Sequence, residues 1–316
     1  MTGLVVQRVL VEDPSEVSPS APARRAVAQV LDDLLEAHPE WPVPRVEGDR
    51  VVTDGNPVSE WLYRSPALRE WRRELVPSAM ALYPVQRVGE DLPSGSEQDE
   101  VTRLVLGDSL DATGIRTRAR VLSDVVGRSV ATAAEDRRST WVSLACGAAV
   151  PVLDARADHR SDARLVLVDV DQRALDFAAE LAERAGLQRG RDLQLLRRDL
   201  VRTVVARDDL VAELGERSAR LVDALGIFEY FSDASAVRLL ANAFRLLEAG
   251  GSLVVGNMLS TRPQLAFNQR GAGWPGLHVR SVEQLAGLVQ RAGLPLDRTT
   301  ISIPQDGVYA VVDVVR

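Results

Sequence analysis

The chain has 316 residues, 46% of them apolar and 26% charged, which is ordinary for a globular protein. No apolar run reaches the ~18 residues of a membrane span, and the N-terminal apolar residues lack the basic region of a signal peptide. The net charge of −7, with no basic block, argues against a nucleic-acid partner.

The first 130 residues are dominated by helical patterns. Apolar residues at helical spacing predict three helices, over 21–38, 59–75 and 112–135. Residues 89–100 contain Pro93, Gly95 and several acids, which indicates a loop. We therefore expect a mainly helical N-terminal region, 1–130, followed by a second domain, 131–316. The helical region is expected to cover a binding pocket and to supply part of a homodimer contact.

From residue 139 onward, apolar runs alternate with helical segments. Strands are expected at 141–145, 165–170, 193–197, 221–227, 253–258, 299–303 and 309–315. The clearest helices are expected at 172–185, 234–247 and 282–292. This order predicts an α/β fold of right-handed βαβ units with a parallel sheet, closed by a C-terminal hairpin around 304–307.

The stretch TWVSLACG, 140–147, and the following RLVLVDVD, 164–171, suggest a nucleotide site. Small residues end one buried strand, and Asp169 ends the next. Small residues let the backbone approach a ligand closely, and a carboxylate at the second position accepts hydrogen bonds from ribose hydroxyls. The neighbouring Asp171 is better placed to cap the helix that follows.

This arrangement resembles the class I S-adenosylmethionine (SAM)-dependent methyltransferases over about residues 116–316. The matching segments are VSLACGAA, VLVDVDQRAL, LLRRDL and EAGGSLVVGNM. The segments LACG, DALGIFEYFSD and VVGNM, with the later tryptophan and arginine, more narrowly resemble a bacterial subgroup that includes 3-hydroxy fatty acid methyl ester synthases. The resemblance implies a Rossmann-like, seven-stranded, mostly parallel sheet with one reversed strand at the end.

The resemblance also implies a set of SAM-binding residues. It assigns Gly147 to the methionine part and Asp199, next to Leu200, to the adenine. One arginine of the preceding helix is expected to bind the cofactor carboxylate, and among Arg116, Arg118 and Arg120 we choose Arg118. The expected cofactor-binding residues are Arg118, Ala145, Gly147, Asp169, Val170, Asp199, Leu200 and Gly226.

Three positions depart from the family pattern. Ser143 stands where the family has an acid, and Ala145 and Ala149 replace glycines. Because alanine disfavours positive φ, we expect ordinary backbone angles at both alanines. A degenerate SAM-fold binding or scaffold protein therefore stays an alternative.

Residues after the fourth and fifth strands are expected to face the cofactor or the acceptor. The substrate-binding candidates are Phe228, Asn257, Trp274 and Arg280, and the catalytic candidates are His278, Glu229 and Tyr230. A base, His278 or Glu229, would serve a hydroxyl or amine acceptor. A carboxylate acceptor would instead need an arginine and a dry pocket, for which Arg280 and Trp274 are suited. The other two histidines are expected at the surface.

The composition excludes several other chemistries. The single cysteine, Cys146, allows no intramolecular disulfide, favours a cytoplasmic protein and is expected to serve in packing. The histidines give no metal-ligand spacing, so no metal is expected. All 38 basic residues are arginines, which removes a Schiff-base lysine and a P-loop lysine. A nicotinamide oxidoreductase is disfavoured by the missing G-x-G-x-x-G and by the terminal hairpin.

The predicted function is a SAM-dependent methyltransferase of secondary metabolism that acts on a small molecule. A carboxylate or hydroxyl oxygen is slightly preferred over nitrogen as the methyl acceptor. A SAM-assisted enzyme of natural-product biosynthesis that does not transfer a methyl group is a further alternative.

Overall fold

The computed structural model describes residues 3–13, 19–131, 138–274 and 276–316. It divides into two compact units. The sheet unit consists of Met1–Val11, Arg118–Thr261 and Leu277–Arg316, and the helical unit of Glu12–Thr117 and Arg262–Gly276.

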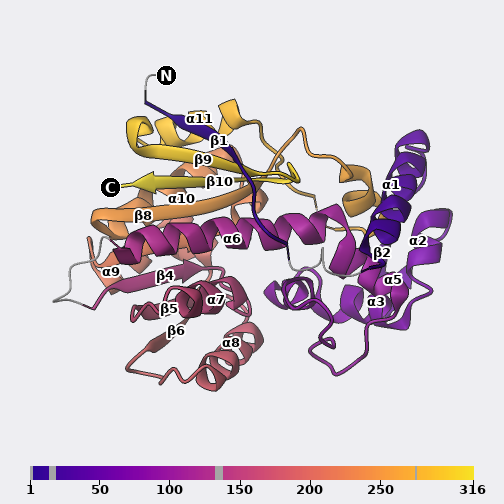
Figure 1. Cartoon of the computed structure of the whole chain (residues 1–316), viewed down its shortest axis with the longest axis horizontal. Coiled ribbons are helices and arrows are strands. Elements are labelled where there is room, and N and C mark those ends of the chain that lie inside the picture. The colour runs from indigo at the N-terminus through magenta and orange to yellow at the C-terminus, as the bar shows by residue number, and fades with distance from the viewer. Residues whose placement is uncertain (1–2, 14–18, 132–137, 275) are drawn as a thin grey trace. The chain divides into compact units, whose positions relative to one another are not determined.

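The sheet unit contains one sheet of eight strands (Figure 1). Their order across the sheet is β1-β9-β10-β8-β7-β4-β5-β6. The strands are β1 (Val5–Val9), β4 (Thr140–Leu144), β5 (Arg164–Asp169), β6 (Leu193–Arg197), β7 (Ala219–Ala224), β8 (Leu247–Met258), β9 (Thr299–Pro304) and β10 (Tyr309–Val315). The seven predicted strands are all present, six of them within three residues of the expected bounds, whereas β8 begins at Leu247, six residues before the predicted start.

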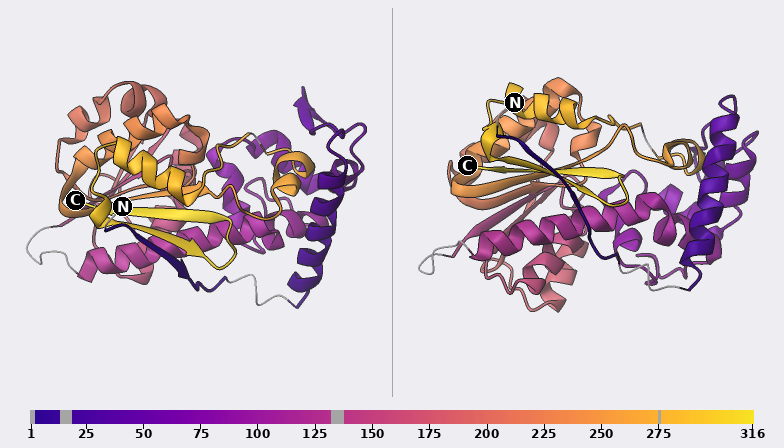
Figure 2. Two further views of the ribbon diagram at one scale, coloured as in Figure 1. Left: turned by 90° about the horizontal axis from the view of Figure 1, so that it is seen from above. Right: turned by 45° about the horizontal axis from the view of Figure 1, so that its top comes forward.

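The expected number of seven strands was too low by one, because β1 was not predicted. This strand pairs in parallel with β9 (Figure 2). Val5 lies opposite Thr300. Four of its five residues are exposed, so β1 lacks the buried alternating positions that identify a strand in a sequence.

The direction of the strands confirms the expected mostly parallel sheet with a reversed strand at its end. β10 runs antiparallel to both β8 and β9, whereas the other strand pairs of the sheet are parallel. The turn of the C-terminal hairpin is closed by a hydrogen bond from the Gly307 N–H to the Pro304 carbonyl, at 3.0 Å.

Helices cover both faces of this sheet. The helical segments are α7 (Val150–Asp158), α8 (Gln172–Arg184), η5 (Val201–Ala206), α9 (Asp209–Leu214), η6 (Phe228–Tyr230), α10 (Asp233–Leu246), α11 (Val282–Arg291) and η8 (Leu296–Arg298). One core cluster joins the sheet to α9, α10 and α11. The second joins it to α7, α8 and the sheet-unit part of α6 (Leu110–Ala131) (Figures 1 and 2). The predicted end of α6, residues 132–135, lies outside the described residues.

Burial on both faces explains why the central strands are continuous apolar runs. In β5, Leu165 and Leu167 belong to one core cluster, and Val166 and Val168 to the other. Successive side chains of a strand point to opposite faces, so a strand between two helix layers needs apolar residues at every position.

The helical unit consists of short elements. They are α1 (Ala21–Ala37), β2 (Arg45–Glu47), β3 (Arg50–Val52), α2 (Pro57–Leu62), α3 (Pro66–Glu70), η2 (Trp71–Leu75), η3 (Ala79–Leu82), α4 (Tyr83–Gln86), α5 (Glu100–Thr102), η4 (Arg103–Asp108) and η7 (Phe267–Gly271). The single helix predicted over 59–75 was wrong. The helix is interrupted before Pro66, because proline lacks an N–H. Ser65 caps the new helix by accepting a hydrogen bond from the Leu68 N–H at 3.0 Å.

The unit boundaries differ from the expected division at residue 130. Residues 262–276 belong to the helical unit, where the Asn56 side chain donates to the Arg270 carbonyl at 3.1 Å and Arg262 forms a bidentate ion pair with Asp111. The predicted roles, substrate binding for 1–130 and cofactor binding for 131–316, stay a prediction.

In the described part of the chain, no helix combines the length and the apolar character that crossing a membrane requires.

Gly256 in β8 provides a test of the sheet geometry. A Cβ atom at this position would lie 2.7 Å from the Leu225 carbonyl oxygen, a backbone atom that cannot move aside. We expect Gly256→Ala to lower the free energy of unfolding by about 1–3 kcal/mol, measured by urea denaturation. Gly287 in α11 has open space around its Cβ position, so Gly287→Ala is the matched control and should stabilise by up to ~1 kcal/mol. Equal effects of the two substitutions would contradict this packing.

Candidate functional site

Four neighbouring parallel strands, β5, β4, β7 and β8, end at the same edge of the sheet. Ligands of open α/β sheets bind outside the carboxyl ends of the strands. The predicted cofactor residues Gly147 and Asp169, and the candidates Gly226 and Asn257, all lie at or just beyond these ends.

The Asp169 carboxylate connects the ends of β4 and β5. The Gly147 backbone N–H donates to its Oδ2 at 2.9 Å, and the Asp171 N–H donates to its Oδ1 at 3.0 Å. Asp169 is 3% exposed, and burial raises the pKa of its carboxyl, while the backbone hydrogen bonds oppose this shift. Each oxygen keeps a lone pair for a further donor. Asp171 caps α8, as predicted, by accepting from the Arg173 N–H.

The turn after β4 adopts left-handed backbone angles. Ala145 has a φ of 51°, Gly147 of 55° and Ala149 of 55°. The expectation of ordinary angles at the two alanines was therefore wrong. A left-handed alanine costs roughly 1–2 kcal/mol, and such conformations persist where surrounding structure imposes them. The turn follows the geometry of a glycine-rich turn even where glycine is absent.

An unpredicted cluster lies beneath this turn. Asp223 of β7 is paired in register with Ser143 of β4. Its carboxylate accepts hydrogen bonds from Trp141 Nε1 at 2.7 Å and from Ser143 Oγ at 3.1 Å. Burial raises the pKa of Asp223 to about 7. The acid missing at Ser143 is thus matched by one on the adjacent strand. The signal in the sequence is an aspartate within the apolar run RLVDAL.

Arg118 and Glu229, predicted separately as a cofactor ligand and a base, form one buried pair. Arg118 Nη1 donates to Glu229 Oε1 at 3.3 Å, and each residue is 3% exposed. The Arg118 guanidinium lies 4.3 Å from the centre of the Tyr309 ring. Burial raises the pKa of the Glu229 carboxyl, and the positive charge of Arg118 opposes that shift.

The other two candidate arginines of α6 have different partners. Arg116 is buried in the helical unit, where it forms a bidentate ion pair with Asp13 at 2.7 and 2.9 Å. Arg120 is exposed and pairs with Asp158 at 3.1 Å.

Asn257 and Arg280 are hydrogen-bonded to neighbouring backbone and to each other. Arg280 donates to Asn257 Oδ1 at 2.7 Å, to Asp233 at 3.0 Å and to the Phe231 carbonyl at 2.5 Å. Asn257 Nδ2 in turn donates to the His278 carbonyl at 3.1 Å, and the His278 N–H donates to the Glu229 carbonyl at 2.7 Å. These bonds hold the segment around His278 against η6. The His278 residue itself is exposed.

The residues after β5 and β6 differ in exposure. Val170 is 59% exposed and Leu200 is buried in the core. The Asp199 Oδ1 atom accepts from the Val201 N–H at 2.9 Å, and Oδ2 lies 3.5 Å from Arg202. Asp199 therefore caps the turn that follows it, while Val170 presents an apolar surface beside Asp169.

The remaining candidates are spread over both units. Phe228 is buried in the core beneath Arg280, whereas Tyr230 and Gly226 are half-buried after β7. Trp274 belongs to the helical unit and stacks on Trp71, with ring centres 5.7 Å apart.

Cys146 is half-buried, and its thiol packs against the core. Burial, with the nearby carboxylates of Asp169 and Asp223, raises the pKa of the thiol well above its usual value, which disfavours a reactive thiolate.

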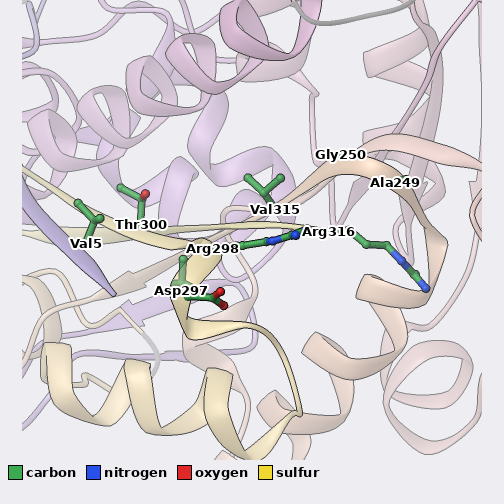
Figure 3. Close-up of a pocket in the computed structure, with 9 residues that line it drawn as sticks. Val5, Ala249, Gly250, Asp297, Arg298, Thr300, Val315 and Arg316 are labelled. Carbon is green, nitrogen blue, oxygen red and sulfur yellow. The ribbon is translucent and has the colours of Figure 1, made fainter. Parts of the chain in front are cut away.

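A surface pocket of about 520 Å³, shown in Figure 3, lies at the other ends of the strands from Asp169. Its lining residues lie near the start of β8 and β9 and the end of β10, and they include Gly250, Arg298, Thr300 and Arg316. None of the predicted site residues lines it.

No protein-family model matches the chain, and no curated protein matches it. Solved structures do share its fold. A possible exported protein from Bordetella parapertussis aligns with a TM-score of 0.64 and 18% identity, over 97% of this chain and 99% of that one. A candidate O-methyltransferase from Nostoc punctiforme aligns with a TM-score of 0.50 and 15% identity, over 92% of this chain and 85% of that one. Both similarities concern the fold alone.

Asp223 makes a prediction about pH. The pKa of its carboxyl in the folded protein is about 7, against an ordinary value of 3.8, so the folded state binds the proton more tightly than the unfolded state. The stabilisation by this proton is complete below 3.8 and is lost as the pH rises to about 7. Asp223→Asn removes this titration.

We therefore expect the free energy of unfolding of the wild type, relative to Asp223→Asn, to fall between pH 4 and about 7 and to stay constant above. Urea denaturation of both proteins across this range measures the difference. A difference that does not change with pH would show that Asp223 is ionised throughout.

Proposed function

We propose that the chain is a SAM-dependent methyltransferase whose acceptor is a small metabolite. The observation that carries the proposal is the Asp169 carboxylate, which accepts the Gly147 N–H where two adjacent parallel strands end. The fold shared with the Nostoc punctiforme protein, described as a candidate O-methyltransferase, supports it.

The residues at this edge fit the cofactor in three ways. The Asp169 oxygens each have a lone pair left for a ribose hydroxyl, and the exposed Val170 offers an apolar surface for a base. Of the three candidate arginines, Arg116, Arg118 and Arg120, Arg118 is the one that retains donors at this edge for a ligand carboxylate. The left-handed turn around Gly147 lets the backbone come close to the ligand.

Bound SAM supplies an activated, electrophilic methyl group. The task of the protein is to hold an acceptor atom in the correct orientation and to exclude water, and orientation alone can lower a barrier by roughly 7–11 kcal/mol. Asn257 and Arg280 would contribute by fixing the segment that carries His278. Asn257 donates to the His278 carbonyl, and Arg280 donates to Asn257 and to the Phe231 carbonyl. His278, which is exposed, is the proposed base for a hydroxyl or amine acceptor.

The preference for a carboxylate or hydroxyl oxygen as acceptor stays part of this proposal, as do a cytoplasmic location and a homodimer. Tyr230, half-buried on η6, and Trp274 of the helical unit are kept as proposed acceptor contacts. The helical region is proposed to determine which acceptor is used.

A second candidate function is SAM binding without methyl transfer, as in a scaffold protein or in an enzyme that uses the cofactor for other chemistry. It is favoured by Ser143, Ala145 and Ala149, since two of these three departures impose left-handed alanines on the turn.

Cofactor binding is tested with S-adenosylhomocysteine and isothermal titration calorimetry. Asp169→Asn removes the negative charge but keeps the shape of the side chain, so we expect affinity to fall about 10- to 100-fold, the effect of losing a hydrogen bond to a charged group. Asp171→Asn is the control, since it changes the adjacent acid, which caps α8, and should leave the affinity unchanged. The wild type failing to bind at all would refute the proposal.

Methyl transfer is tested with SAM labelled in its methyl group and a panel of small carboxylic acids, alcohols, phenols and amines. Label in a product with a mass increased by 14 supports the methyltransferase. Binding of the cofactor without label transfer to any acceptor would favour the second candidate.

A further inference from the structure

The helical unit contains a half-buried arginine without an acidic partner. In the described part of the chain, Arg72 of η2 forms no ion pair with a carboxylate, and its Nε group is buried without a hydrogen-bond partner. The buried Arg116 and Arg262 of the same unit, by contrast, each form a bidentate ion pair with an aspartate. A cation that is withdrawn from water and has no counter-charge is costly, so Arg72 is suited to an anionic ligand.

Asn268 of η7 is a second polar side chain of this unit that is buried without partners. It is 8% exposed, and its side-chain amide makes no hydrogen bond within the described residues. The buried atom is the acceptor Oδ1. Leaving such an atom unsatisfied costs about 1–3 kcal/mol, so Asn268 is suited to a ligand that carries a hydrogen-bond donor.

Two contacts pack the segment around Arg72 against the segment around Asn268. The rings of Trp71 and Trp274 stack with their centres 5.7 Å apart, and the Trp274 N–H donates to the Asn268 carbonyl at 3.1 Å. The Tyr63 hydroxyl donates to the Ala272 carbonyl at 2.6 Å. Burial raises the pKa of this hydroxyl, and the guanidinium of Arg72 beside it opposes the shift. Both polar groups therefore lie close to the aromatic stack.

These side chains define the chemistry of a ligand. A guanidinium binds the two oxygens of a carboxylate in a planar, bidentate arrangement. Asn268 Oδ1 requires a hydroxyl or an N–H group. Trp274 is half-buried, and its ring provides a flat apolar surface on which another ring can stack. An aromatic carboxylic acid that also carries a hydroxyl or N–H group meets all three conditions.

Arg72 takes the role that the sequence assigns to Arg280. Arg280 and Trp274 were expected to serve a carboxylate acceptor together. However, each of the three guanidinium nitrogens of Arg280 is already bonded within the sheet unit, to Asn257, Asp233 and the Phe231 carbonyl. Arg72 directly follows the residue on which Trp274 stacks, and it belongs to the same unit as Trp274.

We propose that Arg72 and Asn268 bind an aromatic carboxylic acid, with its carboxylate on Arg72, its hydroxyl or N–H group on Asn268 and its ring against Trp274. The inference rests on the proposed function in one respect, because it takes this acid to be the methyl acceptor. Arg72 and Asn268 are binding residues, and neither performs a step of the methyl transfer.

The carboxylate is tested by calorimetry with hydroxybenzoic, hydroxycinnamic and indole carboxylic acids, each compared with its uncharged carboxamide. We expect the wild type to bind one or more of the acids at least ~10-fold more tightly than the matched carboxamide. Arg72→Gln should lower the affinity for that acid about 10- to 100-fold and leave the affinity for the carboxamide nearly unchanged. Arg73→Gln is the matched control, since Arg73 is the exposed neighbour of Arg72 and pairs with Glu74 at 2.9 Å, and it should bind as the wild type does.

The donor is tested with the same acid and its counterpart that lacks the hydroxyl or N–H group. The wild type and Arg73→Gln should prefer the acid with the donor by about 5- to 100-fold. Asn268→Leu keeps the approximate size of the side chain but removes the acceptor, so this preference should disappear. A preference that persists in Asn268→Leu would contradict the assignment of Asn268.

Should the site variants fail to fold, the wild type still decides the inference. Equal affinities for acids and carboxamides, or no binding of any acid, would overturn it. The titrations are made with and without saturating S-adenosylhomocysteine, which separates the two hypotheses. Binding of S-adenosylhomocysteine without binding of any acid leaves the proposed function intact. Binding of an acid by a protein that does not bind S-adenosylhomocysteine supports the acid site and refutes the proposed function.

Discussion

The hydrogen bond between the Gly147 N–H and the Asp169 carboxylate holds the candidate site together. It joins the ends of two adjacent strands, and the same carboxylate also holds the start of the next turn through the Asp171 N–H. The Cys146 N–H, which donates to the Val168 carbonyl, and the Ala149 N–H, which donates to the Cys146 carbonyl, hold the same turn, and together these bonds keep two alanines in a left-handed conformation. The hydrogen bonds to Asp169 therefore offset two costs, the strain of the left-handed alanines and the burial of the carboxylate.

Three buried acidic side chains, Asp169, Asp223 and Glu229, lie at this edge of the sheet. Asp169 and Asp223 both influence the Cys146 thiol, and Glu229 lies after the end of the neighbouring strand. Burial raises the pKa of all three carboxyls, which means that keeping them ionised is costly. A ligand with a positive charge lowers that cost, and the sulfonium and ammonium groups of the proposed cofactor both carry one.

Patterns that depend on local sequence were predicted well, and contacts between distant residues were not. The strands Leu193–Arg197 and Tyr309–Val315 have the predicted bounds, because buried apolar runs bounded by turn residues are visible in the sequence. The pairing of Asp223 with Ser143 depends on which strands are neighbours. Arg118 and Glu229 are separated by 111 positions, so their contact has no signature in either segment. The left-handed alanines were missed because the intrinsic preference of alanine was overridden by the surrounding structure.

The edge strand β1 has a consequence for how the polypeptide reaches its final form. Residues near the start of the chain pair with residues near its end, such as Val5 with Thr300. Closing a loop of this length costs roughly 5 kcal/mol of chain entropy, which the few contacts of an exposed strand repay only once β9 is already in place. During synthesis, the first segment must therefore wait, without its partner strand, until β9 has left the ribosome.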